Sequence, residues 1–124
     1  MQKKSVFLVV CFLCLFFAAA GYGRPAGDDL DQGIKQYAAE NYDEAIELLK
    51  KARAGQPQSS AAAYYLGMAY KQTTEYDKAL PHLEDAMMLA PPVKDALSQY
   101  ISVLYLLDRL DQAEQWIEKA EKEN

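Results

Sequence analysis

The chain has 124 residues, of which 51% are hydrophobic, 25% charged and 11% aromatic, a composition that predicts a folded domain and excludes a disordered chain. Its net charge of −5 disfavours nucleic acid as a partner, because no positive field would attract phosphates. All the phenylalanines and both cysteines lie between Phe7 and Phe17, so two unlike segments are joined end to end.

The first segment predicts export. Lys3 and Lys4 precede an uncharged run over residues 6–20 that ends in three alanines, small residues that a signal peptidase accepts. Such a run spans about 22 Å of a hydrocarbon core about 30 Å thick, which favours a cleaved signal peptide at residues 1–20 over the alternative, an uncleaved membrane anchor. Residues 21–27 are rich in glycine and predict a flexible leader. We therefore expect a periplasmic or secreted protein.

The rest of the sequence repeats with a period of about 34 residues, a length typical of a supersecondary unit that buries its apolar face on its neighbours. Small residues, acidic residues and prolines recur at this spacing: Ala45, Ala79 and Ala113; Ala52, Ala86 and Ala120; Asp43, Asp77 and Asp111; Gly33 and Gly67; Pro57 and Pro91. The spacing predicts three units, at about residues 26–59, 60–93 and 94–124.

Each unit contains the pattern of two amphipathic helices. In the middle unit, Ser59 or Ser60 is a candidate N-cap of the first helix. The second helix is expected to begin at a capping box formed by Thr74 and Asp77. Pro81 lies within that helix and predicts either a mild kink or a proline absorbed in the first turn.

These residues resemble the tetratricopeptide repeat (TPR), whose pattern W-x₂-L-G-x₂-Y, A-x₃-F and P runs over about 34 residues. The middle unit matches it at Ala63, Leu66, Gly67, Tyr70, Ala79, Leu83 and Pro91. The resemblance covers residues 26–124. It implies an all-α solenoid of three helix-turn-helix repeats, a right-handed superhelix occupying residues 28–124, and a role in binding other proteins.

The sequence departs from the TPR pattern at two places within the units. Gln32 and Gln36 stand where the first unit should carry Leu and Tyr, so its first helix is expected to pack differently. In the third unit Ile101 replaces the glycine found as Gly33 and Gly67. We therefore expect the two helices of the third hairpin to lie farther apart.

The last predicted helix carries carboxylates where the earlier units carry mostly apolar residues. Glu114 replaces Ile46 and Leu80, and Glu121 and Glu123 stand at further positions of this kind. Burying an unpaired carboxylate costs several kcal/mol. The pattern predicts a polar cap on which no fourth repeat stacks, a complete array, and a monomer.

The resemblance implies a concave groove lined by the first helix of each unit. Eight candidate partner-binding residues fall on it: Tyr37, Tyr64, Met68, Lys71, Gln72, Ser98, Ser102 and Tyr105. Tyr and Met often anchor protein interfaces, although the apolar members of this stripe could equally be core. Lys71 is the only cation on the stripe, which argues against a clamp for a terminal carboxylate. The stripe favours an apolar or amphipathic peptide or helix.

The residues give little support to catalysis, metal binding or a cofactor. His82 is the only histidine and is expected to be a surface residue, since no cysteine, Ser-Asp pair or second histidine is placed to work with it. The acidic pairs lack the glycine-turned loop of a calcium site. We therefore predict a non-catalytic adaptor that binds a partner in the groove. The alternative is a structural subunit of an envelope or secreted complex that uses its convex face and Trp116, which could be packed or exposed.

Overall fold

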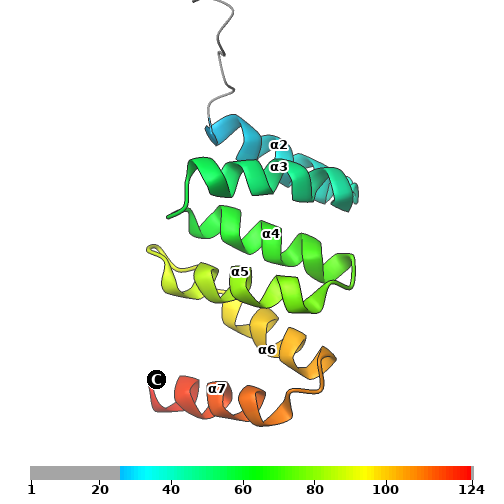
Figure 1. The fold of residues 1–124 in the computed structure, drawn as a ribbon. Helices are drawn as coiled ribbons and strands as arrows, with labels where there is room; N and C mark the ends of the chain where they lie inside the picture. Colours follow the sequence, from blue (N-terminus) through cyan, green and yellow to red (C-terminus); the bar gives the residue numbers. More distant parts are fainter. Residues whose placement is uncertain (1–25, 124) are drawn as a thin grey trace, which may run out of the picture.

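A computed structural model describes residues 26–123 as a stack of α-helices (Figure 1). The helices are α2 (Ala26–Ala38), α3 (Tyr42–Gly55), α4 (Ser60–Gln72), α5 (Tyr76–Met88), α6 (Ala96–Leu106) and α7 (Leu110–Lys122). They follow one another in chain order from α2 at one end to α7 at the other. The described range contains no strand, which confirms the all-α prediction. The predicted signal peptide lies outside the described residues.

The helices form three hairpins, and the glycines of the first two allow close contact within each pair. A Cβ at Gly33 would lie 2.7 Å from Leu49 Cγ, and one at Gly67 would lie 2.8 Å from Leu83 Cγ. Distances this short do not occur between real side chains. Because glycine carries only a hydrogen in place of a side chain, the facing leucine can pack against the helix backbone. Both leucines are fully buried as a result.

The third hairpin is more open, as the replacement of glycine by Ile101 predicts. The close contacts between α6 and α7 are far sparser than those between α2 and α3 or between α4 and α5. Figure 1 shows α6 and α7 spread apart, whereas the helices of the earlier pairs lie side by side. The side chain at Ile101 is itself partly buried against the core.

The main apolar core runs through the three hairpins, beside a small second cluster of Ala63, Ala86 and Ala96. Its largest fully buried members are leucines and a valine from four consecutive helices: Leu49, Leu66, Leu83, Val103 and Leu104. The second helix of each hairpin packs on the first helix of the next, α3 on α4 and α5 on α6. Ion pairs also link neighbouring hairpins, Arg53 with Asp85 and Arg109 with Asp77. No helix within residues 26–123 has both the length and the apolar character needed to cross a bilayer.

The helix caps agree with the sequence in α4 and not in α5. Ser59 Oγ accepts a hydrogen bond of 3.2 Å from the Ala62 N–H and caps α4 as predicted. The predicted capping box at Thr74 is wrong, because α5 has Glu75 at its N-cap position and no side-chain cap bond. The helix α5 continues without interruption past Pro81, which is exposed.

Thr74 instead closes the preceding helix. Its φ is +63°, and the equivalent residues of the other two units, Glu40 and Asp108, have φ of +63° and +58°. The Thr74 N–H donates to the carbonyl of Lys71, and the Glu75 N–H donates to that of Tyr70. This is the Schellman motif, in which glycine normally takes the left-handed position. The chain thus reverses between its two helices by the same device in all three units, without glycine.

We expect Thr74→Gly to stabilise the protein by about 1 kcal/mol. A β-branched residue is strained at positive φ by about 1–2 kcal/mol, and the higher entropy of glycine in the unfolded chain offsets part of this gain. Urea denaturation measures the change. The neighbouring Thr73→Gly is the control and should destabilise, because Thr73 has φ of −83° and bonds the Tyr70 carbonyl through its hydroxyl. A loss of stability in Thr74→Gly would contradict the argument.

Candidate functional site

Three tyrosines from α2 and α4 form a cluster on the predicted binding stripe. The ring of Tyr65 lies edge-on to Tyr37 and to Tyr64, with centroids 5.7 and 5.5 Å away. All three side chains are half-buried. In the described part of the chain, their hydroxyls make no hydrogen bond. Burial and the nearby carboxylate of Asp95 raise the pKa of Tyr64, so its phenol stays protonated and can donate.

A second cluster joins α4 to α6. The Lys71 Nζ donates hydrogen bonds to Gln99 Oε1 at 2.7 Å and to Ser102 Oγ at 3.0 Å. Both acceptors are neutral, and Lys71 pairs with no carboxylate among the residues described. Burial lowers the pKa of the Lys71 ammonium group. The lysine therefore presents a partly buried, unpaired positive charge with one donor unused.

The two clusters are the same contact in successive units. Tyr37 and Lys71 are one repeat period apart, and so are their partners Tyr65 and Gln99. Each pair joins the end of one unit's first helix to the first helix of the next. Our sequence reasoning missed Tyr65 and Gln99, although their equivalence within the repeat was a signal that could have revealed them.

The remaining candidate residues belong to neither cluster. Met68 is half-buried against the core. Gln72 and Ser98 are exposed, and the Ser98 hydroxyl donates to the carbonyl of Asp95 at 2.8 Å. Tyr105 is 50% exposed at the end of α6. The structure therefore links Tyr37 with Tyr64 through Tyr65, and Lys71 with Ser102, and leaves Gln72, Ser98 and Tyr105 at the surface.

His82 is partly buried, so the prediction that it is a surface residue is wrong. Its ring stacks on Tyr70 with centroids 5.7 Å apart and an interplanar angle of 16°. Its Nδ1 atom is buried and has no hydrogen-bond partner in the described structure. Burial, and secondarily the charge of Arg53, lowers the pKa of His82, while Asp85 opposes the shift. The imidazole is packed as a neutral ring.

This environment predicts a pH dependence of stability. The unfolded chain binds the His82 proton at a higher pH than the folded chain does, so the free energy of unfolding should fall as pH drops below about 6.5. Thermal melts between about pH 7.5 and 5 should show a smaller loss for His82→Phe than for the unsubstituted protein. Phenylalanine keeps the ring stack without the titration, and both proteins share every carboxylate. Equal losses in the two proteins would contradict the assignment.

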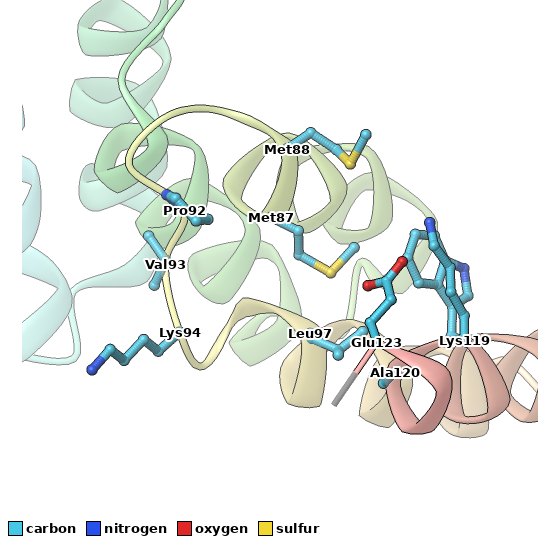
Figure 2. Close-up of a pocket in the computed structure, with 10 residues that line it drawn as sticks. Met87, Met88, Pro92, Val93, Lys94, Leu97, Lys119, Ala120 and Glu123 are labelled. Atoms are coloured by element: carbon cyan, nitrogen blue, oxygen red, sulfur yellow. The ribbon is translucent and has the colours of Figure 1, made fainter.

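A cleft opens between the end of α5, the start of α6 and α7 (Figure 2). Its volume is about 300 Å³, and Met87 and Met88 of α5, Leu97 of α6 and Ala120 of α7 contribute apolar walls. Lys94, Lys119 and Glu123 stand at the same cleft. Trp116 lines it as well and packs edge-on against Tyr100 with centroids 5.4 Å apart. Trp116 is thus packed and partly buried, which is the first of the two alternatives, packed or exposed, that the sequence left open.

Within residues 26–123, no three His, Cys, Asp or Glu side chains are grouped to hold a metal ion. Paired helices stacked in series, with a half-buried polar and aromatic stripe on their first members, define a helical repeat protein. Residues 30–92 match the tetratricopeptide repeat family, and the chain belongs to that family. Its members are generally non-catalytic adaptors that bind other proteins.

Solved structures support the same fold. The second TPR of Spaghetti (RPAP3) bound to the HSP90 peptide SRMEEVD superposes with a TM-score of 0.69 and is 22% identical, over 77% of this chain and 88% of that one. A MamA mutant gives a TM-score of 0.73 at 19% identity, over 83% of this chain and 75% of that one. No curated protein matches the sequence. These likenesses establish the fold alone.

Proposed function

We propose that the protein is a non-catalytic adaptor that binds a peptide or helix of a partner protein in the concave groove formed by α2, α4 and α6. The observation that carries this proposal is the tyrosine cluster. Tyr37, Tyr64 and Tyr65 present half-buried rings whose hydroxyls are unused. Aromatic rings with a free polar end contribute large contact area and directional bonding to protein interfaces.

The chemistry of the stripe indicates the kind of segment it would take. The tyrosines and Met68 suit aliphatic or aromatic anchors, and Lys71 offers one unused donor to a carboxylate or carbonyl. An extended segment or an amphipathic helix with apolar anchors and an acidic or carbonyl group beside them would match both clusters. The protein bound to the HSP90 peptide shares the fold, which supports a peptide ligand without specifying its sequence.

Peptides selected from a display library with the full chain test the proposal. Titration calorimetry should show that Tyr64→Ala weakens the selected peptides by at least about fivefold, roughly 1 kcal/mol, the usual cost of losing an interface anchor. Met88→Ala is the control, because Met88 is 71% exposed on α5 and lies off the groove. Peptides that tolerate Tyr64→Ala and Met68→Ala but are lost with Met88→Ala would refute groove binding.

That outcome would favour the second candidate, a structural subunit that docks by another face. The cleft between α5 and α7 supports this candidate, because its Met-lined wall and Trp116 are residue types common at protein interfaces. The same peptide panel distinguishes the two functions.

We also propose that residues 1–20 direct export and that the adaptor works in the periplasm or outside the cell, as a monomer with no membrane contact after cleavage. The apolar run after Lys3 and Lys4 supports this location. Intact-mass measurement of the exported protein should give the mass of a chain lacking about 20 residues. The full mass in a membrane fraction would indicate the uncleaved anchor instead.

A further inference from the structure

The outer face of α7 corresponds to faces that are covered in the other two units. Leu110, Glu114 and Glu121 recur at spacings of four and seven residues and so share one side of the helix. One and two periods before Glu114 stand Leu80 of α5 and Ile46 of α3, and these helices pack on α6 and α4. Leu80 and Ile46 are each 7% exposed, whereas Glu114 is exposed.

The end of α6 continues this uncovered surface. Tyr105 is the third member of the series that begins with Tyr37 and Lys71. Those two residues contact Tyr65 and Gln99 of the following first helix, but Tyr105 has no such partner in the described chain and is 50% exposed. Its neighbour Leu106 is 51% exposed. We call these two residues and the three of α7 the α7 face.

The periodicity indicates what kind of element fits the α7 face. At both equivalent positions the covering element is an α-helix, packed along α3 or α5 (Figure 1). Tyr105, Leu106 and Leu110 would supply apolar contact to such a helix. These are three of the four large hydrophobic residues that are exposed in the described chain, the other being Met88 in the separate cleft.

The charges of the α7 face restrict the sequence of that helix. Glu114 and Glu121 are exposed and pair with no cation in the part of the chain described. An apolar helix would bury both carboxylates unpaired, at a cost of several kcal/mol. A helix with Lys or Arg opposite each would pair them. Because the glutamates are seven residues apart, these cations would be about 10 Å, or two turns, apart.

We propose that the α7 face, which shares only Tyr105 with the candidate groove residues, is a second interaction surface that binds a basic amphipathic helix of a partner protein. The partner helix carries an apolar stripe that covers Tyr105, Leu106 and Leu110. Lys or Arg residues at a seven-residue spacing flank this stripe and contact Glu114 and Glu121. The proposal does not rest on the proposed groove, because Leu106, Leu110, Glu114 and Glu121 are not among the groove residues.

A pair of synthetic peptides tests this proposal with the full chain. One is an amphipathic helix with a leucine stripe flanked by lysines at seven-residue spacing, and the other has glutamate in place of each lysine. Fluorescence anisotropy should show binding of the lysine peptide only. Two double variants, Glu114→Lys with Glu121→Lys and Leu106→Ser with Leu110→Ser, should each weaken it by about tenfold or more. Circular dichroism melts check that both variants fold, as expected for exposed positions.

A charge-matched control separates a specific site from general attraction to an acidic protein. Glu44→Lys with Glu47→Lys makes the same change in net charge on the exposed side of α3 and should alter affinity by less than about twofold. Equal losses in the two lysine variants, or no loss with the serine variant, would overturn the proposal. Amide shifts confined to the groove around Tyr64 would also overturn it and would leave the groove as the binding site.

Sedimentation of the free protein tests whether a second copy of the chain, rather than a partner helix, binds the α7 face. The proposal predicts a monomer, because a second copy would bring like charges together at Glu114 and Glu121. A concentration-dependent dimer abolished by Leu106→Ser with Leu110→Ser would show that the α7 face binds another copy of the chain, and the proposed basic partner would then be wrong.

Discussion

Replacing Gly67 with alanine is expected to lower the free energy of unfolding by about 2 kcal/mol, because the change overpacks a close helix contact. The new Cβ would lie 2.8 Å from Leu83 Cγ and 3.2 Å from the carbonyl oxygen of Ala79, so α4 and α5 must separate or Leu83 must leave its rotamer. Overpacking of this kind costs about 1–3 kcal/mol, and the better helix propensity of alanine returns at most about 1 kcal/mol. Urea denaturation measures the difference.

Gly27→Ala provides the matched control. Gly27 also lies in a helix, α2, but a Cβ there would meet no atom within 4 Å. The substitution should be neutral or stabilise by up to about 1 kcal/mol, because only the propensity gain applies. If both variants behaved alike, the close contact between α4 and α5 would not be what requires glycine at position 67.

The positions of the helices could be predicted because the repeat constrains them twice, once within each unit and again between units. Ala45, Ala79 and Ala113 are all fully buried, since only a small side chain fits where two helices cross. Gly33 and Gly67 mark the closest approach, and their absence at Ile101 predicted the open third hairpin. Periodic small residues therefore carry information about distance between helices as well as about helix type.

The turns were harder to predict, because a local pattern had two structural meanings. Thr74 and Asp77 satisfy the formula of a capping box, but the chain uses Thr74 at positive φ to end the preceding helix. Threonine is disfavoured there, so propensity pointed away from the observed structure. The equivalent residues Glu40 and Asp108 show that backbone hydrogen bonds of the Schellman motif decide this turn.

The sequence predicted which helices carry the residues of the candidate site, but not the contacts that these residues make between units. Helical spacing assigns Tyr37, Tyr64 and Lys71 to the first helices, but contacts between units depend on how each unit is rotated relative to the last. That rotation places Tyr65 between Tyr37 and Tyr64, and Gln99 against Lys71. His82 was misjudged for a related reason, since its burial comes from stacking on Tyr70 of the neighbouring helix rather than from its own helix.

Leu83→Ala should be the most destabilising of the substitutions considered, with a loss of about 3 kcal/mol. Leu83 is fully buried and belongs to the core cluster that spans the hairpins. Removal of its isobutyl group forfeits hydrophobic transfer energy and leaves a cavity, and such changes cost about 2–5 kcal/mol. The midpoint of urea unfolding should fall accordingly, while the helical circular dichroism signal of the folded protein is retained.

Combining Leu83→Ala with Gly67→Ala should cost less than the sum of the single substitutions, by about 1 kcal/mol, because the alanine methyl at position 67 enters the space that Leu83 leaves. Gly33→Ala combined with Leu83→Ala is the matched control. Position 33 meets Leu49 in the first hairpin, so this pair shares no contact and its effects should add. Additivity in both pairs would mean that Gly67 and Leu83 do not form the contact that sets the distance between α4 and α5.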